Sequence, residues 1–311
     1  MAHTQAQDED PLAELRERLE GMRTQEAVHY AVPDYLAAAW QRELRNDAED
    51  AGAAEEGESI TEQWREKICE WCFEVVDHFD ADREIVAVTM SFLDRYLATR
   101  AVDRRTFRLA AMVALYLALK LCHPGRLRLT ALVELAGGYF TPEHLVAMES
   151  SMLRRLCWRV HPPTAAAFCS QLLPLVPLEV EPGARRAAGE LTRFLTELAA
   201  CDYWFVTKRP SAVAVAAMVN ALELQGPCRI DPRDKVRFLQ RLEHTGMAIA
   251  NDPEILECCE RLREMYKTGD YAPTFEEDAD ADVRVDAESP TGVTDGPYAN
   301  EAEDGSEMEC A

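Results

Sequence analysis

The sequence predicts an all-α protein built of two tandem five-helix bundles. Apolar residues recur at helical spacing through the middle of the chain, and capping residues and prolines separate these periodic segments. No segment with the period of a β-strand stands beside hairpin turn residues. The 311 residues suggest about two domains at roughly 100–200 residues each, and 48% hydrophobic residues are enough to form a sizeable core.

The first predicted bundle, residues 59–161, contains five helical segments. A capping-box pattern at Ser59 and Glu62 opens the first segment, in which apolar residues recur at helical spacing. Thr130 is expected to cap a short fourth helix that ends near two glycines. Thr141 is expected to cap the fifth, which has proline at its first position. The last four segments are expected at about 83–97, 104–121, 130–137 and 141–157.

The second predicted bundle, residues 162–269, begins where Pro162 and Pro163 break the chain. The run Ala-Ala-Met-Val-Ala at 110–114 recurs as Ala-Ala-Met-Val-Asn at 216–220, in the third helix of each half. Small residues let neighbouring helices approach closely, which suits the centre of a bundle. This repeat alone does not decide between two bundles and a single irregular helical domain, which stays open as an alternative. The five helices are expected near 164–174, 182–205, 210–225, 231–250 and 252–267.

Charge is concentrated in the two flanks of the chain, whose total net charge is −23. Residues 1–58 carry 15 acids and 5 bases, and we expect an acidic segment with a helix near 28–46. Residues 270–311 carry 14 acids and 1 base and are predicted to be a disordered tail, either solubilising or regulatory. The residues between these flanks are neutral overall, so neither they nor the acidic flanks offer a positive surface for nucleic acid, which argues against nucleic acid as a partner.

Several classes of protein and site are not expected. No apolar run approaches the roughly 20 residues of a membrane span, and no secretory signal is seen, so we expect a nuclear or cytoplasmic protein with reduced thiols. Cys69 and Cys72 lie inside a helix without a matching pair at zinc spacing, so no metal is predicted. The chain has no nucleotide-binding or kinase motifs, and neither catalytic residues nor a cofactor are expected.

Several segments, in order, resemble the motifs of the cyclin family. The resemblance covers roughly residues 28–267, with a first cyclin box at 64–163 and a second after it. The matching segments are VPDY (32–35), WREKICEWCFEV (64–75), FLDRYL (92–97), LALK (117–120), Met148-Glu149 followed by LRRLCWRVHPPTA, and FVTKRPSAVAVAAM (205–218).

The resemblance implies a non-catalytic subunit that binds and activates a cyclin-dependent Ser/Thr kinase in cell-cycle control. Such a subunit favours the active position of the kinase's C helix, and phosphoryl transfer belongs to the kinase. Two alternatives stay open. One is a transcription-associated cyclin or double cyclin-box adaptor that does not oscillate with the cell cycle, and the other is a helical scaffold without a kinase.

The resemblance also assigns roles to individual residues. Lys120 and Glu149 match the kinase-binding Lys and Glu, which bond main-chain groups around the kinase's C helix. The alternative is that both are ordinary solvated helix residues. Arg65 and Asp94 match an internal ion pair between the first two helices, and each lies among apolar residues that demand a partner.

A groove for Arg-x-Leu peptides of kinase substrates or inhibitors is the last feature the resemblance implies. Lys67 and Arg108 depart from the family pattern by placing cations beside an apolar pocket, and Trp64 is bulkier than the usual Met. We therefore expect weakened or altered peptide recognition. The matching positions are Trp64, Lys67, Ile68, Trp71, Glu74, Phe107 and Arg108.

Overall fold

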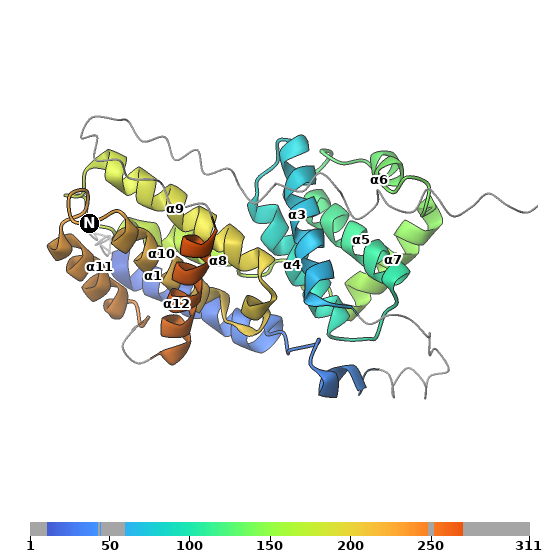
Figure 1. Ribbon diagram of the computed structural model, residues 1–311, viewed down its shortest axis with the longest axis horizontal. Coiled ribbons are helices and arrows are strands. Elements are labelled where there is room, and N and C mark those ends of the chain that lie inside the picture. The colour runs from blue at the N-terminus through green and yellow to red at the C-terminus, as the bar shows by residue number, and fades with distance from the viewer. Residues whose placement is uncertain (1–10, 43, 45–59, 248–251, 270–311) are drawn as a thin grey trace, which may run out of the picture. The chain divides into compact units, whose positions relative to one another are not determined.

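A computed structural model describes residues 11–42, 44, 60–247 and 252–269 (Figure 1). Within these ranges the regular elements are all helices, which confirms the predicted all-α class. The described residues divide into two compact units. The first bundle comprises residues 32–161 and 200–207, and the second bundle comprises residues 11–31, 162–199 and 208–269. The predicted tail at 270–311 lies outside the described residues.

The first bundle is built around α5 (Arg104–Cys122). The run of small residues at 110–114 is completely buried, which lets α4 and α7 pack closely against α5. Asp103 caps α5 by accepting a hydrogen bond from the Thr106 backbone N–H. The other helices are α3 (Glu62–His78), α4 (Glu84–Leu97), α6 (Leu129–Leu135) and α7 (Pro142–Arg155).

Two of the predicted helix starts in the first bundle are wrong. Thr61 is the N-cap of α3, and its hydroxyl accepts from the Trp64 backbone N–H, while the predicted cap Ser59 lies outside the described residues. Helix α6 begins at Leu129, so Thr130 lies within it and does not cap it. The predicted cap of α7 is confirmed, because the Thr141 hydroxyl accepts from the backbone N–H of the third helical residue.

The second bundle places α10 (Pro210–Leu224) against α8 (Ala165–Leu172) and α12 (Pro253–Thr268). Its other predicted helices are α9 (Pro182–Cys201) and α11 (Pro232–His244). Two of the expected segments are interrupted. A short 3-10 turn, η2 (Leu173–Leu175), follows α8, and another, η3 (Tyr203–Thr207), follows α9 and belongs to the first bundle.

The N-terminal segment differs most from the prediction of a helix near 28–46. The chain forms α1 (Pro11–Gln25) and a π-helical turn, η1 (Glu26–Tyr30), and both belong to the second bundle. Residues 31–34 are not helical, and helical residues return only at 38–42 and 44. Helix α1 was not predicted because residues 1–58 were interpreted from their acidic composition. Its apolar residues Leu15, Leu19 and Met22 nevertheless recur at helical spacing.

Candidate functional site

Helices α5 and α7 bring Lys120 and Glu149 together on the surface of the first bundle. The Lys120 ammonium nitrogen lies 2.8 Å from a carboxylate oxygen of Glu149. The Lys120 side chain is 52% exposed and the Glu149 side chain is 17% exposed. Both residues lie in the part of each helix that the packing of α5 on α7 holds side by side, although 29 positions separate them in the sequence.

The electrostatics of this pair are those of a partly solvated contact. The hydrogen bond to Glu149 raises the pKa of Lys120, while burial opposes the rise. The ammonium also lies 5.6 Å from the centre of the Tyr116 ring, within the range of a cation–π contact. A pair this exposed contributes about 0–1 kcal/mol to stability. This contribution to stability is too small to explain why a Lys and a Glu occupy these positions.

Exposed apolar side chains lie on the same two helices and on the turn after α7. Val146 is 52% exposed and precedes Glu149 by three positions, which puts both on one face of α7. Leu121 follows Lys120 directly and is also exposed. Sequence analysis missed these residues, although helical spacing from Glu149 could have found Val146.

Trp158 is a second feature that sequence analysis missed. Its side chain is 68% exposed. Cys157 and Trp158 both have left-handed backbone conformations, with φ of 52° and 59°. Arg95 brackets the turn by donating to the carbonyl oxygens of Leu156 at 3.2 Å and Arg159 at 2.9 Å. Because these bonds hold the backbone of the turn, binding would need to order only the Trp158 side chain, which suits an interface anchor.

Arg65 and Asp94 form a buried, bidentate ion pair between α3 and α4. The guanidinium donates to the two carboxylate oxygens at 2.8 and 2.9 Å. The same guanidinium donates to the carbonyl oxygens of Ala200 and Cys201 at 3.0 and 3.1 Å. Interaction with Asp94 raises the pKa of Arg65 despite its burial, so the guanidinium stays charged.

Two tyrosines extend this buried network. The Tyr35 hydroxyl donates to Asp94 at 2.8 Å, and the Tyr35 and Tyr203 rings pack edge to face at 5.3 Å. The Tyr203 hydroxyl donates to Asp34 at 2.7 Å and accepts from the Leu36 backbone N–H at 2.9 Å. Burial raises the pKa of both tyrosines, so both remain hydrogen-bond donors at neutral pH. No local pattern predicts this contact, because Tyr203 is 168 positions from Tyr35.

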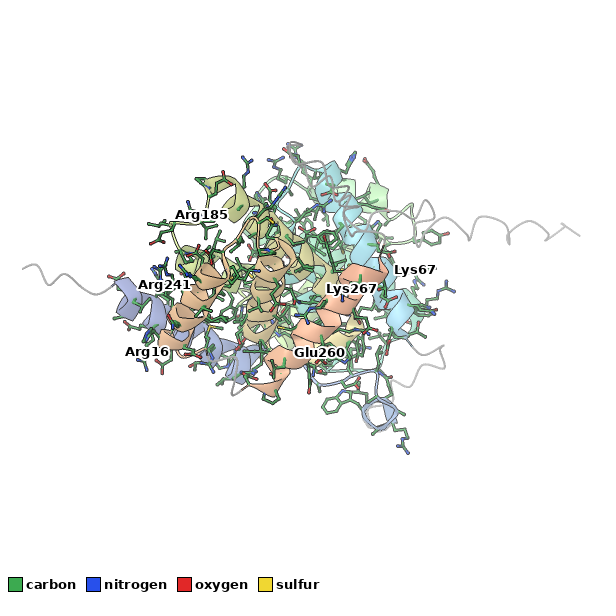
Figure 2. All side chains as sticks on the ribbon, turned by 60° about the vertical axis from the view of Figure 1, so that its left-hand side comes forward. Arg16, Lys67, Arg185, Arg241, Glu260 and Lys267 are labelled. Atoms are coloured by element: carbon green, nitrogen blue, oxygen red, sulfur yellow. The ribbon has the colours of Figure 1, made fainter. Side chains whose placement is uncertain are left out.

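The apolar positions of the predicted peptide groove are buried in the first bundle or packed against its core. Ile68, Trp71 and Phe107 are buried in the core of the first bundle. The Trp64 ring packs 5.9 Å from the Phe107 ring, and the Arg104 guanidinium lies 5.2 Å from the centre of the Trp64 ring. The polar positions lie nearer the surface, with Lys67 exposed (Figure 2) and Glu74 and Arg108 half-buried.

Neither a metal site nor a membrane span is found in the described part of the chain. No group of three or more His, Cys, Asp or Glu residues within those ranges could hold a metal ion. Burial raises the pKa of the Cys69 and Cys72 thiols, which disfavours the thiolate that a metal would need. Among the described helices, none is both long and apolar enough to cross a bilayer.

The described residues form two helical bundles, and comparisons with known proteins show which proteins the chain is similar to. A family model described as "Cyclin, N-terminal domain" matches residues 34–161. G2/mitotic-specific cyclin-B2 of Oryzias luzonensis is 28% identical over 172 residues, which are 55% of this chain and 43% of that protein. G2/mitotic-specific cyclin S13-6 of Glycine max is 25% identical over 209 residues, which are 67% of this chain and 43% of that protein.

Two solved structures share the fold. A viral cyclin from herpesvirus saimiri superposes with a TM-score of 0.57 at 16% identity, covering 83% of this chain and 96% of that one. A chain of the CAK complex of Chaetomium thermophilum, bound to ATP-gamma-S, gives a TM-score of 0.57 at 17% identity, with 81% and 79% covered. Residues 34–161 are thus similar to the N-terminal domain of cyclins, and the fold resembles that of the viral cyclin. The chain's matches span less than half the length of these curated relatives.

Proposed function

We propose that this chain binds a cyclin-dependent protein kinase through the surface around Lys120 and Glu149 and thereby activates it. The observation that carries the proposal is the juxtaposition of these two side chains beside exposed apolar residues. A charged pair with exposed apolar side chains on the same two helices suits a protein interface, where polar groups fix orientation and apolar groups supply area.

The chemistry of the pair suits recognition of a partner's main chain. The Lys120 ammonium carries three N–H donors and can bond carbonyl oxygens, while the Glu149 carboxylate can accept from backbone N–H groups. Holding each other at 2.8 Å pre-orients both side chains and reduces the ordering that binding requires. Because the pair is partly solvated, exchanging its internal bond for bonds to a partner costs less than opening a buried pair.

Activation would follow from differential binding. A subunit that contacts the kinase's C helix more strongly in the active position than in the inactive one shifts the kinase toward the active state. The kinase's own Lys–Glu pair and activation loop then reach their catalytic arrangement. In this proposal the chain is a regulatory subunit, and the kinase transfers the phosphoryl group.

A role in the cell-cycle is the finer part of the proposal. The relatives from Oryzias luzonensis and Glycine max are both named as G2/mitotic-specific cyclins. Their similarity favours a cell-cycle kinase over a transcriptional one. The protein's abundance across synchronised cells tests this part, since a constant level would favour the transcription-associated alternative.

The first-helix groove is proposed to recognise Arg-x-Leu peptides weakly. Burial of Ile68 and Phe107, together with Trp64 packed on Phe107, leaves little apolar surface for the peptide's Leu. The exposed Lys67 would also oppose the peptide's Arg. Calorimetry with an ordinary Arg-x-Leu peptide should show binding weaker than micromolar, and micromolar affinity would contradict the proposal.

An activation assay with matched variants tests the kinase role. The full chain is mixed with candidate cyclin-dependent kinases, and phosphorylation of a protein substrate is measured for the wild type and for Lys120→Ala/Glu149→Ala. We expect the wild type to activate at least one kinase and the double variant to lose most of this activation. Lys267→Ala, an exposed change in the second bundle, serves as the control. Equal activation by the double variant would contradict the assignment of the contact pair.

A further inference from the structure

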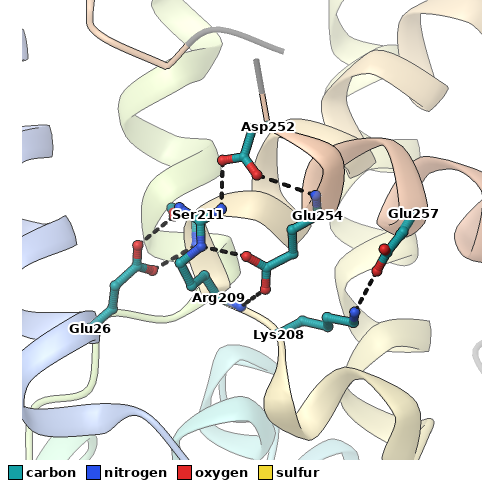
Figure 3. A network of polar contacts seen from close by, with 7 residues as sticks. All are labelled: Glu26, Lys208, Arg209, Ser211, Asp252, Glu254 and Glu257. Atoms are coloured by element: carbon teal, nitrogen blue, oxygen red, sulfur yellow. Dashed lines mark hydrogen bonds and ion pairs between the residues drawn. The ribbon is translucent and has the colours of Figure 1, made fainter. Parts of the chain in front are cut away.

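The second bundle contains a buried carboxylate that the proposed kinase contact does not use. Glu26 lies in η1, is only 3% exposed and points at the N-terminus of α10 (Figure 3). One carboxylate oxygen accepts from the Ser211 backbone N–H at 2.9 Å, and the other accepts from the Ser211 hydroxyl. A carboxylate is rarely buried to this extent without a defined role, because removing it from water is costly.

Glu26 ends a stripe of buried and half-buried residues along α1 and η1. Leu15, Leu19, Met22 and Glu26 follow one another at intervals of three or four positions, so they share one helical face. Leu19 is completely buried and α1 packs against α8. The apolar part of the stripe supplies area, and Glu26 supplies a directional contact at its end.

The opposite face of α1 has the character of a solvated surface. Arg16 and Glu20 are exposed there, and Arg16 lies at the edge of the second bundle in Figure 2. A second polar contact fixes the inner face, because the Arg23 guanidinium donates to the Gly246 carbonyl oxygen at 3.1 Å. Gly246 follows α11 in a left-handed conformation with φ of 81°, which aims its carbonyl without strain.

Charged groups around Glu26 come from three elements. Arg23 approaches from α1, and Arg209 approaches from the residue before α10. Arg209 is itself engaged by Asp252 and Glu254 at the start of α12, so its charge is shared (Figure 3). The net effect is that burial raises the pKa of Glu26, while the Ser211 bonds and the two arginines lower it by less.

We propose that residues 11–30 are a latched strap, a sixth helix that completes the second bundle, and that the Glu26–Ser211 contact is its latch. The occupant of this surface of the second bundle is therefore the chain's own N-terminal segment. The strap precedes the segment that matches the cyclin family model, which begins at residue 34. A chain that begins at residue 34 would lose the contact of α1 with α8 and the carboxylate at the start of α10.

The latch has a defined pH dependence. The docked strap holds a proton on Glu26 more tightly than the released strap does, because the pKa of Glu26 is raised in the docked state. Docking therefore strengthens as the pH falls toward the raised pKa and weakens as the pH rises above it. Glu26→Gln keeps an acceptor for the Ser211 N–H and removes the titration.

Hydrogen–deuterium exchange on the full chain tests the proposal. In wild type we expect the amides of residues 11–30 to be protected. Glu26→Ala should reduce that protection about tenfold or more, the loss expected for a hydrogen bond to a charged group, and leave α3 and α4 unchanged. Glu26→Gln should retain most of the protection, and the exposed control Glu20→Ala should behave as wild type. Unchanged protection in Glu26→Ala, or an equal loss in Glu20→Ala, would overturn the proposal.

Two further measurements keep the test decisive if Glu26→Ala unfolds the second bundle. Ser211→Ala removes only the hydroxyl donor and should lower the strap's protection by a smaller factor than Glu26→Ala does. The ratio of strap protection between wild type and Glu26→Gln, measured at pH 5.5 and pH 7.5, cancels the intrinsic exchange rates. This ratio should be larger at the lower pH. The proposal that Glu26–Ser211 is a latch would be overturned if the ratio did not change with pH and Ser211→Ala left the protection of the strap unchanged.

Discussion

Replacing Arg65 with Ala should destabilise the first bundle more than any surface substitution. Arg65 uses four hydrogen bonds at 2.8–3.1 Å, two to the Asp94 carboxylate and two to the carbonyl oxygens of Ala200 and Cys201. Removing the guanidinium leaves the Asp94 carboxylate buried, with the Tyr35 hydroxyl as its remaining donor among the bonds described here. Breaking a buried ion pair in this way costs about 3–5 kcal/mol.

The expected effect can be measured by thermal and urea unfolding followed by circular dichroism. At about 2–4 °C of Tm for each kcal/mol in domains of this size, the Arg65→Ala variant should melt about 6–20 °C below wild type. Lys67→Ala is the matched control, since Lys67 is exposed two positions further along α3. Its free energy of unfolding should stay within about 0.5 kcal/mol of wild type.

A double variant separates the ion pair from the packing around it. Arg65→Met/Asp94→Leu removes both buried charges, so it should be more stable than Arg65→Ala alone, although the two orphaned carbonyl groups prevent full recovery. A loss below about 1 kcal/mol for Arg65→Ala would refute the reasoning, because it would approach the effect of about 0.5 kcal/mol expected of an ordinary surface substitution. The reasoning would also be refuted if the loss of unfolding free energy in the double variant equalled the sum of the losses in Arg65→Met and Asp94→Leu.

Three other outcomes follow from the structure. Thr141→Ala removes the N-cap of α7 and should lower the free energy of unfolding by about 0.5–2 kcal/mol, whereas Thr141→Ser should retain stability in the same urea titration. Trp158→Ala should leave the melting temperature within about 2 °C of wild type, because an exposed side chain contributes little to the fold. In a binding titration the same variant should bind the kinase about tenfold more weakly or worse. Unchanged affinity would exclude Trp158 from the interface. Iodoacetamide at pH 8 should modify the exposed Cys157 and Cys228 well before Cys69, whose pKa is raised by burial, and peptide mass spectrometry showing early labelling of Cys69 would contradict its burial.

The helices of the first bundle were predictable because local signals specify them. Thr141 followed by Pro142 marks the start of α7 in the sequence, and the structure places the cap there. The start of α3 was harder to predict, because serine and threonine are both common N-caps, and the structure places the cap at Thr61. Local propensity thus predicts that a helix exists more surely than it predicts the residue where the helix begins.

The contacts between distant segments could not be read from residue patterns. Nothing local connects Tyr35 with Tyr203, or Glu26 with Ser211, because those contacts depend on how the chain folds back. The closeness of Lys120 and Glu149 was expected only through the resemblance to cyclins. The apolar stripe of α1 has helical spacing in the sequence, so it was predictable from periodicity even though residues 1–58 are acidic overall.

The central claim is that the end of α5 and the exposed face of α7 form the contact with the kinase. Hydrogen–deuterium exchange of the full chain, with and without a saturating cyclin-dependent kinase that it activates, tests this claim most directly. Binding should slow exchange at residues 116–123 and 145–158 and leave α11 and α12 unchanged. Slowed exchange confined to α11 and α12, with residues 116–123 unaffected, would contradict it.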